Sequence, residues 1–134
     1  MSEENVAIVR RLYTGWELGD LRAADFFHDE IEHSRIGSEL PGINGEWRGM
    51  EALGLAMASY LNALADLRIK AERMIDIGGD RVLVLSRHIA RGKTSGLPFE
   101  HELGDLFTLS DGKVLRYVSY WDRADALEAA GLSD

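Results

Sequence analysis

Residues 82–109 predict one long β-hairpin, and this hairpin constrains the fold more than any other segment. Two runs of alternating residues, 81–91 and 99–109, flank a short turn segment at 94–98. Symmetric pairing about Gly96 and Leu97 sets His88 directly opposite Asp105. Because side chains alternate between the two faces of a strand, this pair would share one face with apolar neighbours. An ionisable pair on an apolar face is typical of a small-molecule site.

The rest of the chain predicts helices followed by a sheet, which is an α+β order. Helices are expected at 3–18, 21–27, 50–65 and 122–131, and strands at 30–36, 67–77, 82–91, 99–109 and 114–121. The glycine-rich segment 37–49 is expected to be a loop in which Trp47 closes over the mouth of the cone. Asp111-Gly112 is expected to form a type I′ turn. The four later strands then form an antiparallel meander, with strand 30–36 at an edge.

The two faces of this sheet differ in composition. One is expected to carry Val82, Val84, Ser86, His88, Leu103, Asp105, Phe107, Val118 and Tyr120. The other mixes Leu83, Leu85, Ile89, Leu106, Leu115, Tyr117 and Trp121 with Arg87, Arg91 and Glu102. The helices can cover only one face, so the mixed face is expected to be a homodimer interface.

Composition narrows the class of protein. At 134 residues and 46% hydrophobic, the chain predicts one domain with a proper core. The net charge of −8 disfavours a nucleic-acid partner, and the absence of cysteine excludes disulfides and thiolate metal sites. The amino end is acidic and no apolar run approaches the length of a membrane span, so a cytoplasmic protein without a membrane partner is expected.

Six short sequence motifs follow one another along the chain, and their order and spacing are informative together. They are Ile8-Val-Arg-Arg-Leu-Tyr13, Gly19-Asp-Leu21, Phe26-Phe27, Arg48-Gly-Met-Glu-Ala52, the run from Asp105 to Val114, and Tyr120-Trp-Asp-Arg123. In their order and spacing they resemble the SnoaL-like branch of the nuclear transport factor 2 superfamily, which includes ketosteroid isomerase. The resemblance covers nearly the whole chain.

The resemblance implies a single SnoaL-like domain over residues 1–134 with a cone-shaped, barrel-like α+β fold. N-terminal helices would pack in a strongly curved, mainly antiparallel sheet, and a short helix would end the chain. The group includes isomerases, aldol cyclases, epoxide hydrolases, dehydratases and ligand binders, so the fold does not set the reaction. Asp105 aligns with the carboxylic acid in the oxyanion hole of ketosteroid isomerase. Leu12 aligns with the tyrosine that donates a hydrogen bond in that enzyme, and Arg35 aligns with its general-base aspartate, so two of the three catalytic residues are replaced. Steroid isomerisation by the family mechanism is therefore not expected.

His88 with Asp105 is the first candidate for chemistry. A carboxylate that fixes the imidazole tautomer would raise the pKa of His88 toward working pH and let it act as a general acid or base. Asp105 would then be the orienting residue, ionised by its partner. The alternative is a structural cross-strand pair with no chemical role.

Five further residues are candidates for a substrate-binding wall. His33 would face inward near the cone mouth or lie exposed at a sheet edge. Trp16 and Tyr60 lie on helical stripes, where core packing is the commoner role. Tyr120 would donate its hydroxyl to a ligand, and Asp122 either faces the pocket or caps the final helix. The four histidines lack metal-ligand spacing, so no metal is expected.

These observations predict a pocket protein that uses no cofactor. The first hypothesis is an isomerase, cyclase or dehydratase that moves protons on a small hydrophobic or polyketide-like molecule. The second is a dimeric binder of a small apolar ligand without catalysis. A third is an assembly module that engages another protein.

Overall fold

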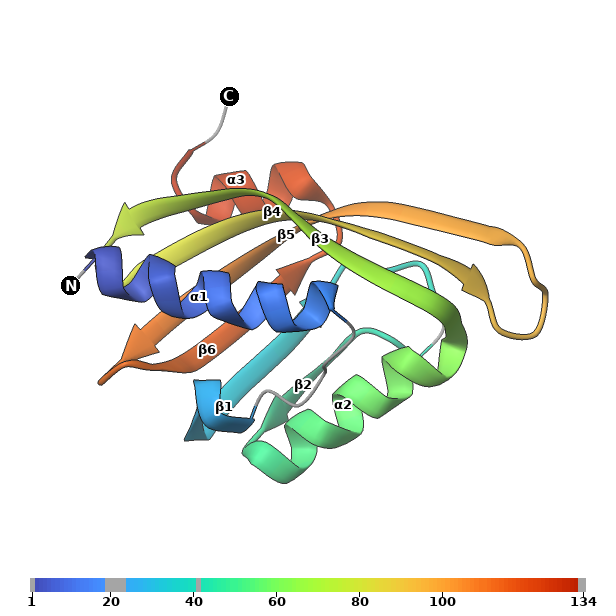
Figure 1. Cartoon of the computed structure of the whole chain (residues 1–134), viewed down its shortest axis with the longest axis horizontal. Coiled ribbons are helices and arrows are strands. Elements are labelled where there is room, and N and C mark those ends of the chain that lie inside the picture. Colours follow the sequence, from blue (N-terminus) through green and yellow to red (C-terminus); the bar gives the residue numbers. More distant parts are fainter. Residues whose placement is uncertain (1, 19–23, 41, 133–134) are drawn as a thin grey trace.

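The protein is built on one six-stranded mixed sheet that is curved like an open cone (Figure 1). The computed structural model describes residues 2–18, 24–40 and 42–132. The strands, in the spatial order β2-β1-β6-β5-β4-β3, are β1 Phe27–Ile36, β2 Gly45–Arg48, β3 Leu64–Gly78, β4 Arg81–Gly92, β5 Pro98–Ser110 and β6 Lys113–Tyr120. The helices are α1 Ser2–Glu17, α2 Met50–Ala63 and α3 Arg123–Ala129, with a 3₁₀ turn, η1, at Ala24–Phe26. The predicted α+β cone is confirmed.

Two helices cover the inner face of the sheet and the third covers part of the outer face (Figure 1). The apolar stripe of α1 buries Val9, Leu12, Tyr13 and Trp16 against β3, β4, β5 and β6. This burial follows from the helical spacing of the stripe, which turns every third or fourth residue toward the sheet. The outer cluster is smaller and joins α3 to apolar residues of β4 and β5.

The predicted register of the β4–β5 hairpin is wrong by four residues. His88 lies opposite His101, and Asp105 lies opposite Val84. The chain reverses over residues 93–96, where the backbone N–H of Gly92 donates to the carbonyl of Leu97 at 2.9 Å, so the turn comes earlier than the expected centre at 96–97. Four is an even number, and therefore His88 and Asp105 still share the inner face, although they are not a cross-strand pair.

The predicted faces of β6 are exchanged. Asp111 and Gly112 have the positive φ angles of a type I′ turn, as expected. Just beyond it, however, Leu109 pairs with Val114 while Thr108 pairs with Arg116, so β6 carries one extra residue in a bulge. One extra residue inverts every later side chain. Tyr117, Ser119 and Trp121 therefore face inward with Phe107, Asp105 and Leu103, whereas Tyr120 packs in the outer cluster under α3.

The segment between the first two long helices also differs from the prediction. The expected helix 21–27 lies partly outside the described residues, and its end is the 3₁₀ turn followed by β1 from Phe27. This strand is not at the edge: it pairs in parallel with β6 and antiparallel with β2. The expected loop 37–49 contains β2, so Trp47 stacks on His33 from a strand instead of closing the cone as a loop lid.

Helix boundaries elsewhere are confirmed closely. The helix expected at 50–65 is α2, and the last helix begins directly after Asp122. The carboxylate of Asp122 accepts a hydrogen bond from the backbone N–H of Ala124 at 2.9 Å. Capping is therefore the observed role of Asp122, whose side chain lies outside the inner face. No helix in residues 2–18, 24–40 and 42–132 is long and apolar enough to cross a membrane.

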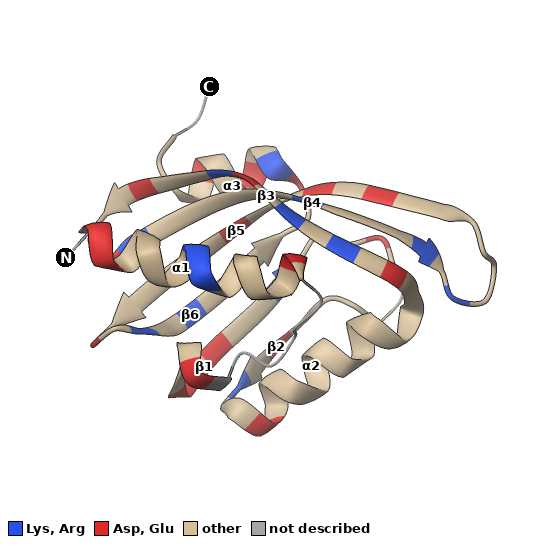
Figure 2. Cartoon of the chain, in the orientation of Figure 1, with Lys and Arg blue, Asp and Glu red and all other residues tan. Residues whose placement is uncertain are grey.

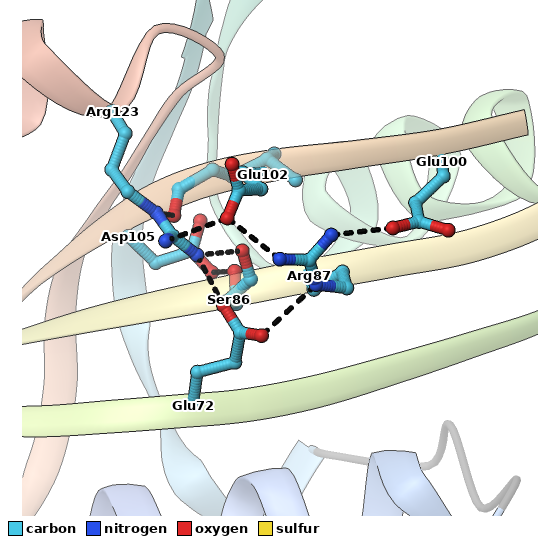
Figure 3. A network of polar contacts seen from close by, with 8 residues as sticks. Glu72, Ser86, Arg87, Glu100, Glu102, Asp105 and Arg123 are labelled. Carbon is cyan, nitrogen blue, oxygen red and sulfur yellow. Dashed lines mark hydrogen bonds and ion pairs between the residues drawn. The ribbon is translucent and has the colours of Figure 1, made fainter.

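The uncovered part of the outer face is a network of ion pairs (Figure 3). Arg87 and Arg123 both pair with Glu72, at 2.9 and 2.7 Å, and both pair with Glu102, at 2.7 and 3.0 Å. Arg87 also pairs with Glu100. Both arginines of this network are thus paired with carboxylates, while the apolar residues Leu83 and Leu106 of the mixed face pack against α3.

The contact between α3 and β5 predicts a sharp response to one added methyl group. A Cβ built on Gly104 would lie 2.1 Å from the Cβ of Ala126, so Gly104→Ala overpacks this contact. We expect the free energy of unfolding to fall by about 1–3 kcal/mol, measured by urea denaturation. Gly54→Ala is the matched control, since it sits in α2 with nothing within 4 Å. It should raise the free energy of unfolding by roughly 0.5–1 kcal/mol; equal effects of the two variants would contradict the packing described.

Candidate functional site

A buried cavity lies between the inner face of the sheet, α1 and α2. It is lined by Trp16, Arg35, Met57, Tyr60, Leu61, Leu67, Ile69, His88, Leu103, Tyr117, Ser119 and Trp121. Its volume is about 40 Å³, which holds about three water molecules. Met57, Leu61 and Leu67 are half-buried, whereas the polar wall is buried. The cavity is therefore closest to solvent on the side of α2 and the start of β3.

One row of residues across the sheet carries the buried charges. Arg35 of β1 is the register partner of Ser119 in β6, and Ser119 is the partner of Asp105 in β5. The Ser119 hydroxyl donates to Asp105 Oδ1 at 2.8 Å. Ser119 lines the cavity and Asp105 does not, so the carboxyl group lies one residue behind the cavity wall.

Asp105 is held by three hydroxyl groups and is only 1% exposed. Besides Ser119, Ser86 donates to Oδ2 at 3.0 Å, and the Tyr13 hydroxyl donates to the same oxygen. Burial raises the pKa of Asp105, while the three donors oppose the rise because they favour the ionised form. His88 is not among its partners. The expectation that His88 keeps Asp105 ionised is therefore wrong, and the cause is the shifted hairpin register.

Arg35 is a buried cation with an unusual set of neighbours. Its side chain is 5% exposed, and its guanidinium carbon lies 5.1 Å from the ring centre of Trp47 and 5.2 Å from that of Tyr60. Nη2 donates to the carbonyl of Ala56 at 2.7 Å. Nη1 is buried without a hydrogen-bond partner among the described residues. Burial lowers the pKa of Arg35, and its electrostatic interactions with Tyr117, Tyr60 and Asp105 oppose this change.

His88 and Tyr60 form a second polar group in the cavity wall. The Tyr60 hydroxyl lies 2.5 Å from His88 Nδ1, and the His88 ring is 6% exposed. Burial lowers the pKa of His88 to about 3, and the positive charges of His101 and Arg35 add to this effect. The imidazole is therefore neutral at neutral pH, contrary to the raised pKa expected from a carboxylate partner. Burial raises the pKa of Tyr60, so its phenol stays protonated.

His33 faces inward, as one of the two alternatives predicted, but it does not line the cavity. Its ring stacks between Tyr117, at 4.3 Å between ring centres, and Trp47, at 5.4 Å. Nδ1 lies 2.8 Å from the carbonyl of Tyr117, and Nε2 is buried without a partner among the described residues. Burial lowers the pKa of His33 to about 4.

The cavity thus brings together some of the predicted site residues and leaves others out. His88, Tyr60 and Trp16 line it, whereas Asp105 lies behind Ser119 and His33 lies behind Tyr117 and Trp47. Tyr120 and Asp122 do not line it, because the bulge in β6 turns Tyr120 outward and Asp122 caps α3.

Several contributors were not predicted as site residues, and Arg35 and Tyr13 are the most important of them. Arg35 follows Ile31 and His33 at the alternating spacing of β1, and this spacing already indicated that it faces inward. Tyr13 stands on the apolar stripe of α1, one residue after Leu12, the position first matched to the family tyrosine donor. It is Tyr13, and not Leu12, that reaches Asp105. Among the described residues, no group of three or more His, Asp or Glu side chains is placed to hold a metal ion.

A curved sheet packed on helices around a mainly apolar cavity is the architecture of nuclear transport factor 2-like proteins. The family model of the SnoaL-like domain matches residues 9–117, and the chain belongs to this family. No curated protein matches the sequence significantly.

Solved structures share the fold at low sequence identity. A nuclear transport factor 2-like protein of unknown function from Burkholderia pseudomallei K96243 is 16% identical with a TM-score of 0.78, covering 93% of this chain and 95% of that one. TerC, co-crystallised with polyporic acid, is 21% identical with a TM-score of 0.77, covering 96% and 98%. A candidate SnoaL-like polyketide cyclase from Jannaschia sp. CCS1 is 22% identical with a TM-score of 0.76, covering 99% and 94%.

The low pKa of buried His88 predicts a specific pH dependence of stability. In the unfolded chain the histidine has its ordinary pKa of about 6.5, so between pH 6.5 and 3 only the unfolded state binds the proton. Its contribution is fully present above pH 6.5 and is lost as the pH falls toward 3. From pH 7 to pH 5 the loss is about 2 kcal/mol for this one group. His88→Gln should therefore lose about 2 kcal/mol less than the wild type over this range, measured by urea denaturation at both pH values. The same pH dependence in both proteins would show that His88 is not buried as a neutral group.

Proposed function

We propose that residues 1–134 act as one SnoaL-like domain that binds a small hydrophobic or polyketide-like molecule and moves a proton on it without a cofactor. The reaction would be of the isomerase, cyclase or dehydratase type. The observation that carries this proposal is the convergence of His88, Tyr60 and Arg35 on one apolar cavity. The candidate polyketide cyclase from Jannaschia and the co-crystallisation of TerC with polyporic acid support a small organic ligand in this fold.

In this proposal the three polar residues have different roles. His88 is neutral and contacts Tyr60 through Nδ1; in the tautomer whose Nδ1–H donates to the Tyr60 oxygen, Nε2 is unprotonated, takes a proton from the substrate and returns it to the product. The Tyr60 contact fixes the ring orientation. Arg35 stabilises negative charge that develops on a substrate oxygen, which is most effective in a buried site of low dielectric. Trp16, Trp121 and Leu103 hold the apolar body of the substrate.

Asp105 acts behind this wall as a positioning residue. It accepts hydrogen bonds from the hydroxyls of Ser119, Ser86 and Tyr13 and so fixes their orientation next to the cavity. The catalytic role first expected for it required direct contact with His88. In the present proposal it acts through Ser119 and through its field on Arg35.

A second candidate function is a binder without catalysis. It is favoured by the pKa of His88 at about 3, which makes the imidazole a weak base in the empty cavity. Both functions use the same cavity. They differ in whether a bound molecule is changed.

Proton exchange on a model ketone separates the two functions. We expect the wild type to accelerate exchange of the protons beside the carbonyl of 2-tetralone in D₂O, followed by NMR. His88→Gln should lower this rate by about a hundredfold or more, because general acid–base groups contribute on that scale. His28→Gln is the control, since His28 lies outside the cavity wall. Saturable binding of 2-tetralone with no accelerated exchange would contradict catalysis and leave the binder.

A homodimer through the outer face, and a cytoplasmic location, remain part of the proposal. The surface available for a dimer interface is smaller than the sequence suggested. The reason is that α3 covers Leu83 and Leu106 and that the charged residues form ion pairs within the chain. The remaining surface for a second copy is the edge of the Arg87–Arg123 network with half-buried Phe99. Sedimentation equilibrium measures this directly: a mass near twice 14.9 kDa supports the dimer, and 14.9 kDa contradicts it.

A further inference from the structure

Two residues of the cavity wall carry buried hydrogen-bond donors without an acceptor in the part of the chain that the structure describes. Arg35 Nη1 and Trp16 Nε1 are both buried, both belong to residues of this wall, and both lack a partner among the described residues. The two side chains are 5% and 4% exposed. Buried donors are nearly always satisfied in folded proteins, and an unsatisfied one costs free energy comparable to a lost hydrogen bond. The occupant of the cavity is therefore expected to supply acceptors.

The positive charge of Arg35 also calls for a negative charge nearby, which water cannot supply. About three water molecules would fill the cavity and could accept hydrogen bonds, but they carry no charge. Among the described residues no carboxylate forms an ion pair with Arg35. The negative group in its row of the sheet is Asp105, on the far side of Ser119 and engaged with three hydroxyls. A buried charge is stabilised best by direct contact with the opposite charge.

Neighbouring elements leave this positive charge isolated. Figure 2 shows α2, which packs over the cavity, almost without charged residues. Its single charged residue is Glu51 in the first turn, which is exposed. The other residues of the wall are apolar or neutral, since burial keeps His88 uncharged and Tyr60 protonated. The cavity is thus an apolar site with one fixed cation, inside a chain whose net charge is −8.

We propose that the natural ligand carries an anionic oxygen, as a carboxylate or an ionised enol or phenol, and that Arg35 binds this oxygen through Nη1. Trp16 Nε1 supplies a second donor from the same wall. The ligand's apolar body, aromatic or alicyclic, lies against Trp16, Trp121 and Leu103. This inference rests on the proposed function in that both need an occupied cavity, but it concerns the charge of the ligand and not the reaction.

The stacking of Arg35 supports a binding role over a purely structural one. The rings of Trp47 and Tyr60 both lie against the guanidinium and the carbonyl of Ala56 binds Nη2, so the orientation of the group is restricted before a ligand arrives. Such preorganisation lowers the entropy lost on binding. A cation present only for stability would be replaceable by an apolar side chain of similar size without changing which molecules enter.

Benzoate and benzamide test the charge requirement, because they share one shape and differ in charge. Both are titrated into the intact protein, and occupancy is read from tryptophan fluorescence, since Trp16 and Trp121 line the cavity. We expect the wild type to bind benzoate at least about tenfold more tightly than benzamide, as for a charge-assisted hydrogen bond. Arg35→Met should reduce this preference to less than about twofold. Arg35→Lys should retain part of it, because it keeps the charge and loses the planar fork.

Arg68→Met is the matched control for the arginine substitution. Arg68 is exposed on β3, between the cavity residues Leu67 and Ile69, so removing it changes net charge without touching the wall. It should leave the preference for benzoate unchanged. If Arg35→Met fails to fold, the wild type still tests the inference with 4-nitrophenol, whose ionised form is yellow. A cavity with a free cation lowers the pKa of the bound phenol, whereas a purely apolar cavity raises it.

The outcomes separate this inference from the proposed function. Equal binding of benzoate and benzamide, or a raised pKa of bound 4-nitrophenol, overturns the anionic ligand and leaves a cavity for neutral molecules. A preference that persists in Arg35→Met overturns the role of Arg35. Binding of neither probe overturns both this inference and the small-molecule site itself.

Discussion

The buried guanidinium of Arg35 is the constraint on which the rest of the site depends. Moving an arginine out of water is costly, and the chain limits this cost with two aromatic rings, one backbone carbonyl and a carboxylate one residue away. These four partners come from three elements of the fold. Trp47 lies on β2, Tyr60 and Ala56 lie on α2, and Asp105 lies on β5. Arg35, the charged residue of the cavity wall, therefore also helps to hold α2 over the sheet through its contacts with Ala56 and Tyr60.

The bulge in β6 makes this arrangement possible. It places Ser119 between Arg35 and Asp105 in one row of the sheet, and Tyr117 between His33 and Phe107 in the next. Without the extra residue, Val118 and Tyr120 would face inward, and Asp105 would lose a hydroxyl donor. Arg35 and Ser119 of the polar row form the buried wall of the cavity, and the aromatic row next to it packs in the core against α1. One irregular residue thus divides the inner face into a packed part and a binding part.

Much of this could be predicted from the sequence, and the failures have local causes. Helical spacing located α1, α2 and α3, and alternation located β3 to β6. Alternation also assigned His88 and Asp105 to one face. This assignment is correct although the predicted register is wrong, because the register is shifted by four residues, an even number, and side chains alternate with a period of two. The Tyr120 prediction failed because a bulge has no reliable signal in the sequence. β2 was missed because four residues among glycines resemble a loop until β1 is present to pair with them. Arg35 was overlooked because arginines are rarely buried, although its spacing after Ile31 and His33 placed it inward.

The central claim is that the cavity beneath α2 binds a small molecule through Arg35. The most direct measurement is a crystal structure of the protein grown with 4-bromobenzoate, in which anomalous scattering locates the bromine directly. The account predicts bromine inside the cavity lined by Trp16, Trp121 and Leu103, with the carboxylate on Nη1 of Arg35 and with Met57 and Leu61 displaced to admit it. Bromine found only at the surface, with ordered water alone beside Arg35, would contradict it.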